Sequence, residues 1–387
     1  MASSFSPSSS PFSLLSFNKL IIVCILLITT ANPVLGYYKS IFSFGDSLAD
    51  TGNVLYANPN ENVGKLPYGE TYFRRATGRF SDGRVVLDFI AQAVGLPLLR
   101  PYLGSSSKDL QQGANFAVGG ATALDASFFE DRKIVVPNNA SLGVQLEWFK
   151  QLLPSLCNTS SNDCHEYLKK SLILMGEIGG NDYNHPFFQG RSVEEIRTFV
   201  PEIVNAISLA IKALIKEGAV TFMVPGNFPI GCSALYLTLF KSTNKEDYDE
   251  SGCIKWLNEF SVYHNKFLQK ELDVLREEYP NVKIIYADYY NAALKFYQFP
   301  ETLGFKNGAL KACCGGEGPY NCNQNVHCGS ADAKLCDDPS TYVNWDGVHL
   351  TEAAYKFLAN SLMQENHQLF FPNNNIITTT TEGGHDE

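Results

Sequence analysis

Short apolar runs alternate with longer amphipathic runs along most of the chain. Runs of about four to eight apolar residues are typical of strands buried on both faces, whereas apolar residues spaced three and four apart are typical of helices. The short runs predict strands over Ser40–Phe44, Asn115–Val118, Leu172–Ile178, Val220–Val224 and Val282–Ala287. The amphipathic runs predict helices over Val85–Val94, Leu142–Leu153, Val193–Glu217, Ile254–Tyr279 and Glu352–Glu365.

This alternation of strands and helices predicts an α/β fold with a parallel central sheet and right-handed crossovers. Gly218 directly follows one predicted helix and is a suitable residue to end it. Because no internal repeat or long linker divides the chain, we expect residues 37–372 to form one domain. Residues 373–387 are polar and Thr-rich, and we expect a disordered tail there.

The N-terminal residues 1–36 are predicted to be a secretory signal peptide. A Ser-rich start is followed by Lys19, the apolar run Leu20–Ile28, and small residues up to Val34-Leu35-Gly36. A retained membrane anchor is the alternative, but this run is too short to span a bilayer. We therefore expect a secreted protein, in the apoplast or the vacuole, without a stable membrane anchor.

The composition supports a large core and disfavours nucleic-acid binding. Hydrophobic residues make up 45% of the 387 residues, which is enough for a substantial interior. The net charge of −10 becomes −11 without the signal peptide, because that segment contains one Lys and no acidic residue. A nucleic-acid surface requires clustered Lys and Arg, and no long basic run is present.

Secretion also determines how the cysteines are interpreted. Nine of the 10 cysteines lie beyond the signal peptide, and in an oxidising compartment most of them should form disulfides. The expected pairs are Cys157–Cys164 and Cys232–Cys253, and an odd number of cysteines leaves at least one free or paired between chains. A zinc site formed by Cys313, Cys322, His327 and Cys328 is the alternative for the C-terminal cluster. Asn139 and Asn158 begin glycosylation sequons.

Two short motifs far apart in the chain together contain a serine nucleophile, a general base and a carboxylate that can orient the base. Gly45-Asp46-Ser47-Leu48 follows the first predicted strand, and Asp346-Gly347-Val348-His349 lies near the C-terminus. A serine hydroxyl requires a base within hydrogen-bond distance and a group that orients the base. We expect Ser47 to be the nucleophile, His349 the general base and Asp346 the residue that orients it.

Two intervening motifs contain the donors that an oxyanion requires. Asn115-Phe116-Ala117-Val118-Gly119-Gly120 and Gly179-Gly180-Asn181-Asp182 each follow or overlap the end of a predicted strand. In parallel α/β sheets this edge is where ligands bind. We expect an oxyanion hole formed by the backbone N–H groups of Ser47 and Gly120 and the side-chain amide of Asn181. Gly119 is the alternative donor in the second motif.

Taken together, these four motifs resemble those of the plant GDSL esterase/lipase family, within the SGNH hydrolase superfamily. The resemblance extends over nearly the whole mature chain and includes Phe80-Ser81-Asp82-Gly83-Arg84, Val224-Pro225-Gly226 and Cys313-Cys314-Gly315-Gly316. It implies a three-layer α/β/α, flavodoxin-like fold with a central parallel sheet, a Ser-Asp-His acyl-enzyme mechanism, and no metal or organic cofactor. The regions around 67–73 and 80–100 look most like the branch containing sinapine-esterase-like and acetylated-alkaloid-esterase-like members.

The resemblance therefore implies a secreted esterase that acts on small plant metabolite esters. An acyltransferase that moves an acyl group, such as a hydroxycinnamoyl group, from an ester donor to an alcohol acceptor is the first alternative, because its chemistry is the same up to the acyl-enzyme. A non-catalytic wall- or carbohydrate-binding protein is the second. The expected partners are a small-molecule ester and, for a transferase, an alcohol.

Overall fold

The computed structural model describes residues 37–157 and 161–371. Its centre is a five-stranded sheet in the order β2-β1-β3-β4-β5, in which all neighbouring strands are parallel. The strands are β1 (Ser40–Ser43), β2 (Gly113–Asn115), β3 (Ser171–Leu174), β4 (Thr221–Pro225) and β5 (Lys283–Ala287). A two-stranded antiparallel ribbon, β6 (Cys314–Gly315) with β7 (Lys334–Leu335), lies outside this sheet.

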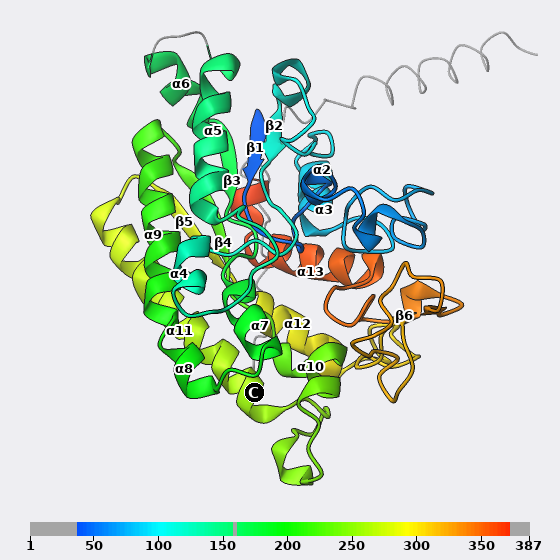
Figure 1. Ribbon diagram of the computed structural model, residues 1–387. Helices are drawn as coiled ribbons and strands as arrows, with labels where there is room; N and C mark the ends of the chain where they lie inside the picture. Colours follow the sequence, from blue (N-terminus) through cyan, green and yellow to red (C-terminus); the bar gives the residue numbers. More distant parts are fainter. Residues whose placement is uncertain (1–36, 158–160, 372–387) are drawn as a thin grey trace, which may run out of the picture. The chain divides into compact units, whose positions relative to one another are not determined.

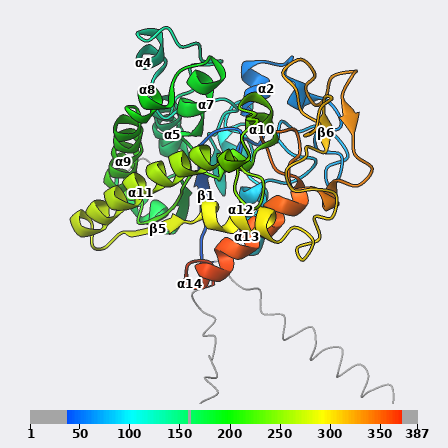
Figure 2. The ribbon, with the colours of Figure 1, turned by 90° about the horizontal axis from the view of Figure 1, so that it is seen from below.

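Helices cover both faces of the sheet, as Figures 1 and 2 show. One face carries α5 (Leu142–Leu156), α9 (Val200–Glu217) and α11 (Lys255–Glu278), and the other carries α3 (Val86–Ala93), α12 (Tyr289–Gln298) and α13 (Glu352–Glu365). The shorter helices are α2 (Asn53–Ala57), α4 (Ala126–Glu130), α6 (Ser161–Leu168), α7 (Gly180–Phe188), α8 (Val193–Arg197), α10 (Ala234–Leu239) and α14 (His367–Phe370). Single 3-10 turns occur at Asn62–Gly64, Ser107–Leu110, Ile230–Cys232, Lys245–Asp247 and Pro339–Thr341.

The strand side chains alternate between two hydrophobic cores. Phe42 and Phe222 pack with α5, α9 and α11, whereas Ile41 and Met223 pack with α3, α12 and α13. All four are nearly inaccessible to solvent, and burial of such a side chain contributes about 1.5–3 kcal/mol. The uninterrupted apolar runs of the sequence therefore reflect a sheet that is covered on both faces.

The expected fold class is confirmed. The strand order places β1 between β2 and β3, so the crossovers leave in opposite directions from β1 and β3. In flavodoxin-like sheets of this order, ligands bind at the carboxyl ends of these two strands. Both the Ser47 motif and the Asn181 motif begin there.

One predicted helix was wrong in extent. The segment Val193–Glu217 contains two helices, α8 and α9, separated by Thr198 and Phe199. Pro201 lies in the first turn of α9. Because proline has no N–H to donate to a carbonyl one turn earlier, a helix cannot continue through it without loss of a hydrogen bond. The same segment is long and apolar enough to cross a membrane, but half of it is buried, as in a core helix of a globular domain.

Two strand predictions were also displaced. β2 ends at Asn115, where Asn115–Val118 was expected to begin a strand, and β3 ends at Leu174 rather than Ile178. Beyond these points the polar motifs turn away from the sheet to form the site. Gly218 ends α9 in the left-handed conformation (φ 112°), as predicted.

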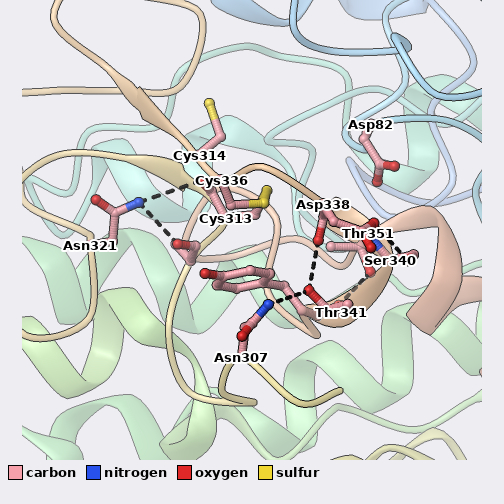
Figure 3. The surroundings of a disulfide bond; sticks show 12 residues. Asp82, Asn307, Cys313, Cys314, Asn321, Cys336, Asp338, Ser340, Thr341 and Thr351 are labelled. Carbon is pink, nitrogen blue, oxygen red and sulfur yellow. Dashed lines mark hydrogen bonds between the residues drawn. A yellow bond between two sulfur atoms is a disulfide. The ribbon is translucent and has the colours of Figure 1, made fainter. Parts of the chain in front are cut away.

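Four disulfides lie within the described part of the chain. Cys157–Cys164 and Cys232–Cys253 are the two pairs expected from the sequence, and Cys313–Cys336 and Cys314–Cys328 join the C-terminal cluster. The alternative of a zinc site was wrong, because the sulfur atoms of Cys313 and Cys328 belong to disulfides. Figure 3 shows Cys313 and Cys336 with Asn321, whose amide donates to the carbonyl oxygen of Ala312 at 3.0 Å. Cys322 is a free, buried thiol.

Several predictions fall outside the described residues. They concern the signal peptide at 1–36, the sequon at Asn158 and the whole tail at 373–387. Asn139 lies within the described part of the chain, in an exposed position between α4 and α5. This exposure is compatible with the predicted glycosylation sequon.

Candidate active site

The turn after β1 presents Ser47 at the edge of the sheet. Gly45 has a φ of +143°, and a Cβ at this position would lie 2.9 Å from the carbonyl oxygen of Glu177, so only glycine is accommodated. The side chain of Gln145 on α5 accepts from the Gly45 N–H at 2.9 Å and donates to its carbonyl oxygen at 2.8 Å. Helix α5 therefore fixes the backbone two residues before Ser47.

Ser47, His349 and Asp346 form a continuous chain of hydrogen bonds. The Oγ of Ser47 lies 2.7 Å from Nε2 of His349, and Nδ1 of His349 lies 2.7 Å from Oδ2 of Asp346. Ser47 and His349 are 302 positions apart in the sequence. This arrangement can remove the hydroxyl proton when the oxygen attacks a carbonyl carbon.

The carboxylate of Asp346 is stabilised in its charged form. Its Oδ1 accepts from the backbone N–H groups of Val348 and His349 at 3.1 and 2.9 Å, and its Oδ2 also accepts from the hydroxyl of Tyr68 at 2.8 Å. Burial alone would raise the pKa of Asp346, but the charge and hydrogen bonds of His349 and the bond from Tyr68 lower it to about 2. Asp346 is therefore ionised throughout the neutral range.

An aromatic ring packs on one face of the His349 imidazole. The ring of Phe80 packs on the imidazole of His349 with centroids 4.6 Å apart, and Tyr68 meets Phe80 edge-on. The imidazole is thus held by Phe80 on its face and by Asp346 at one nitrogen. Its other nitrogen faces Ser47.

The second motif offers one free backbone donor, at Gly120. The N–H of Gly119 donates to Asp50 at 2.8 Å, whereas no acceptor among the described residues is recorded for the N–H of Gly120 or of Ser47. Gly120 has a φ of +80°, and a Cβ there would press on Pro137. The geometry therefore favours Gly120 over Gly119 as the backbone oxyanion donor.

The direction of the Gly120 N–H is fixed from the preceding residue. The side-chain amide of Asn138 donates to the carbonyl oxygen of Gly119 at 2.9 Å. Because the peptide group is planar, holding that carbonyl also holds the N–H of Gly120 on the opposite side. The side chain of His185 lies 3.0 Å from the Gly120 carbonyl oxygen and secures the next peptide.

Asn181 reaches the site from the first turn of α7, but its amide is already engaged. Nδ2 donates to Oδ2 of Asp46 at 3.1 Å and to the carbonyl oxygen of Ala121 at 3.0 Å. Asn184 donates to Oδ1 of Asn181 at 3.1 Å, which fixes the orientation of the amide. Asn181 can contribute to an oxyanion only by sharing one of these hydrogens.

Several acidic and amide side chains of the motifs join the loops to one another. Asp50 accepts from the N–H groups of Gly52, Asn53, Val54 and Gly119. Asn115 donates to the carbonyl oxygen of Ala49 at 2.6 Å, and Asp182 accepts from two N–H groups in the loop after Gly120. The residues that form these bonds have a structural role and take no direct part in the proposed reaction. They hold the loops after β1, β2 and β3 in one arrangement.

The candidate catalytic residues line two cavities. One has a volume of about 70 Å³ and is lined by Ser47, Asn181, Phe228, Tyr236 and Leu350. The other has a volume of about 500 Å³ and is lined by His349 and by the aromatic rings of Tyr68, Phe80 and Phe188. Small-molecule sites commonly have volumes of about 300–1,000 Å³. The larger cavity is therefore large enough to hold a small-molecule ester.

Four residues of the site were not identified from the sequence: Tyr68 as a partner of Asp346, Gln145, Asn138 and Glu177. A signal existed for two of them. Gln145 is a polar residue on the buried face of an amphipathic helix, and Glu177 is a charged residue at the end of an apolar run. Tyr68 belongs to the stretch 67–73, which the sequence singled out only through the family resemblance. Asn138 lies in a polar loop and gives no local signal.

Comparison with known proteins shows the family to which this chain belongs. The family model described as GDSL-like Lipase/Acylhydrolase matches residues 41–362. A GDSL esterase/lipase of Arabidopsis thaliana is 52% identical over 350 residues, covering 89% of this chain and 87% of that protein. Sinapine esterase of Brassica napus is 52% identical over 343 residues, covering 87% of this chain and 88% of that protein. This chain therefore belongs to the GDSL-like lipase/acylhydrolase family and is a carboxylic ester hydrolase of the plant type.

Proposed function

We propose that the protein is a secreted serine esterase that hydrolyses small plant metabolite esters through an acyl-enzyme on Ser47. The observation that carries the proposal is the hydrogen-bonded series Ser47–His349–Asp346, with both contacts at 2.7 Å. Such a series meets the distance that proton transfer from a nucleophile requires. The alternative of a non-catalytic wall-binding protein gives no reason for this alignment.

In the proposed mechanism, His349 Nε2 accepts the hydroxyl proton while Ser47 Oγ bonds to the ester carbonyl carbon. The oxyanion accepts from the N–H groups of Ser47 and Gly120, and the amide of Asn181 supplies a third donor. The C–O bond then breaks, the alcohol leaves with the proton from His349, and the acyl group stays on Ser47. Water then gives a proton to His349 and attacks the acyl carbon. The bond between that carbon and Ser47 Oγ breaks, the free acid leaves, and His349 returns the proton to Ser47 Oγ.

The two cavities suggest the size of the substrate. Ser47 lines one cavity and His349 the other, and we propose that the ester bond lies between these two side chains, where His349 can protonate the leaving oxygen. The cavity of about 500 Å³ has three aromatic rings, which suit a flat hydroxycinnamoyl group better than a long aliphatic chain. The Brassica relative is named for action on sinapine, and we propose a substrate of similar size for this chain.

The experiment compares the wild-type protein with Ser47→Ala on acetyl, hydroxycinnamoyl and fatty-acyl esters, with products identified by mass. We expect the wild type to release free acid and the variant to lose activity by at least about 10³-fold, because removal of a triad member leaves only binding and the oxyanion hole. A folded Ser47→Ala protein with several per cent of wild-type kcat would contradict the assignment of the nucleophile.

The same measurement distinguishes hydrolysis from acyl transfer. Polyols, sugar acids and quinate-like alcohols are added at millimolar concentration to one ester donor. We expect free acid to dominate, because the proposed enzyme uses water as the acceptor. A transacylated product in excess of free acid would show that the protein is an acyltransferase, with Ser47, Asp346 and His349 in unchanged roles.

Secretion and the domain boundaries are part of the proposal. The four disulfides are typical of proteins that fold in an oxidising compartment, and we propose that residues 1–36 direct the chain there. The mature protein would then be a single domain over residues 37–372. N-terminal sequencing of secreted protein should find a start near Tyr37, and treatment with an endoglycosidase should reduce the mass if Asn139 is glycosylated. A start at Met1 would contradict the cleavage.

A further inference from the structure

A second buried carboxyl group lies beside the nucleophile and has no part in the mechanism described above. Glu177 follows β3 and is 6% exposed, and its side chain forms a hydrogen bond with that of Asp46, which is 2% exposed. The backbone carbonyl of Glu177 also accepts from the N–H of Asp46 at 3.1 Å. Glu177 is therefore joined twice to the residue directly before Ser47.

Two buried carboxyl groups in hydrogen-bond contact must share one proton, because two adjacent carboxylates repel each other. Asp46 is the better site for the negative charge, since it also accepts from the N–H of Leu48 at 3.0 Å and from Nδ2 of Asn181 at 3.1 Å. Burial and the charge of Asp46 raise the pKa of Glu177 well above its usual value. Glu177 therefore holds the proton and donates it to Asp46.

Among residues 37–157 and 161–371, no cation forms an ion pair with Glu177 or lowers its pKa. A Cβ on Gly180 would lie 2.6 Å from Oε1 of Glu177, so the carboxyl group presses against the residue before Asn181. The titratable groups that face Glu177 are acids and phenols, none of which is positively charged: Asp46, Asp182, Tyr183, Tyr236 and Tyr289.

The hydrogen bond from Glu177 bears directly on the oxyanion donor. Asn181 has both amide hydrogens engaged, one of them by Asp46. If Asn181 shares that hydrogen with an oxyanion, Asp46 loses one of its donors inside the protein. The donors that remain to Asp46 are the acid proton of Glu177 and the N–H of Leu48.

We propose that Glu177 is a positioning residue of the esterase. Its carboxylic acid donates to Asp46, which releases an amide hydrogen of Asn181 for the oxyanion and keeps a second negative charge away from the transition state. Loss of this proton at alkaline pH would leave two carboxylates beside Ser47 and would disfavour formation of the oxyanion. The inference rests on the proposed function, because it concerns the same site.

Three proteins test this proposal: the wild type, Glu177→Gln and Glu177→Ala, with kcat and KM measured from pH 6 to 10. The glutamine amide is a donor of similar shape that cannot ionise. We expect Glu177→Gln to retain kcat within about 3-fold at pH 7 and to lose the alkaline decline of the wild type. Glu177→Ala should lower kcat by about 10- to 100-fold, somewhat less than the loss of an entire oxyanion donor, with KM changed by less than about 3-fold.

Glu271→Gln is the matched control, because Glu271 lies on α11 and accepts from Ser208 on α9, away from the site. It should keep the wild-type pH profile. Circular dichroism establishes that each variant is folded, and if Glu177→Ala does not fold, the pH profile of Glu177→Gln alone decides. The proposal is overturned if Glu177→Gln keeps the alkaline decline or is as impaired as Glu177→Ala. In that case the assignment as a serine esterase would still stand if Ser47→Ala abolishes activity, because that result does not depend on Glu177.

Discussion

The hydrogen bond from Asn138 to the Gly119 carbonyl gives a sharp test of the oxyanion geometry. Asn138→Ala removes the 2.9 Å hydrogen bond to the Gly119 carbonyl, together with the 3.0 Å bond that Asn138 Oδ1 accepts from the Ala140 N–H, and leaves the Gly120 N–H itself in place. Such a bond contributes about 0.5–1.5 kcal/mol. If this free energy serves to align the peptide in the transition state, kcat should fall by about 2- to 13-fold, because about 1.4 kcal/mol corresponds to a factor of ten.

The assay is steady-state hydrolysis of a chromogenic ester, together with the rate of inactivation by a fluorophosphonate. Both reactions place negative charge on an oxygen in the same hole, so we expect both rates to fall by a similar factor while KM changes by less than about 2-fold. Asn139→Gln is the matched control. It alters the neighbouring exposed side chain and leaves the bond to Gly119 intact.

An unchanged kcat in folded Asn138→Ala would show that the Gly119–Gly120 peptide needs no support from this side chain. A loss confined to KM would assign Asn138 to ground-state binding of the ester instead of transition-state stabilisation. An equal loss of kcat in Asn139→Gln would show that the effect comes from disturbing the whole loop and not from the bond to Gly119. Each of these outcomes would refute the proposed alignment of Gly120.

Three other changes have expected outcomes. Tyr68→Phe removes one of several donors to Asp346 and should lower kcat by about 2- to 10-fold; unchanged kinetics would show that the backbone donors suffice. Burial, opposed by backbone hydrogen bonds, raises the folded-state pKa of Asp182 to about 7, so its contribution to stability is complete below pH 4 and is lost as the pH rises through 7. Thermal unfolding should therefore show a steeper fall in Tm from pH 5 to 8 for the wild type than for Asp182→Asn, and parallel curves would contradict this. Replacement of Cys314 and Cys328 by Ala should lower the free energy of unfolding by about 2–4 kcal/mol in denaturant titrations, unless the reduced loop remains structured.

The sequence determined the parts of the fold that depend on local patterning. Uninterrupted apolar runs identified β1, β3, β4 and β5 because both faces of the sheet are covered, whereas the run meant for β2 overlaps it only at Asn115. The amphipathic period identified α11 and α13 within one residue at each end. It also contained the reason for the break between α8 and α9, since Pro201 acts within one helical turn. The four motifs could be recognised from the sequence because they too are local. Each is a few consecutive residues whose side chains are needed together.

Only the tertiary structure decided which groups hold these motifs in place. Tyr68 and Asp346 are 278 positions apart, and Gln145 and Gly45 are 100 positions apart. Hydrogen bonds of this kind require atoms within about 3 Å and close to a straight line, and that alignment arises only when the helices pack on the sheet. The preference for Gly120 over Gly119 depends on Asp50 in another loop, and the proton between Asp46 and Glu177 depends on the burial of both. Local sequence indicates the type of a residue, whereas packing sets its partners and its exposure to water.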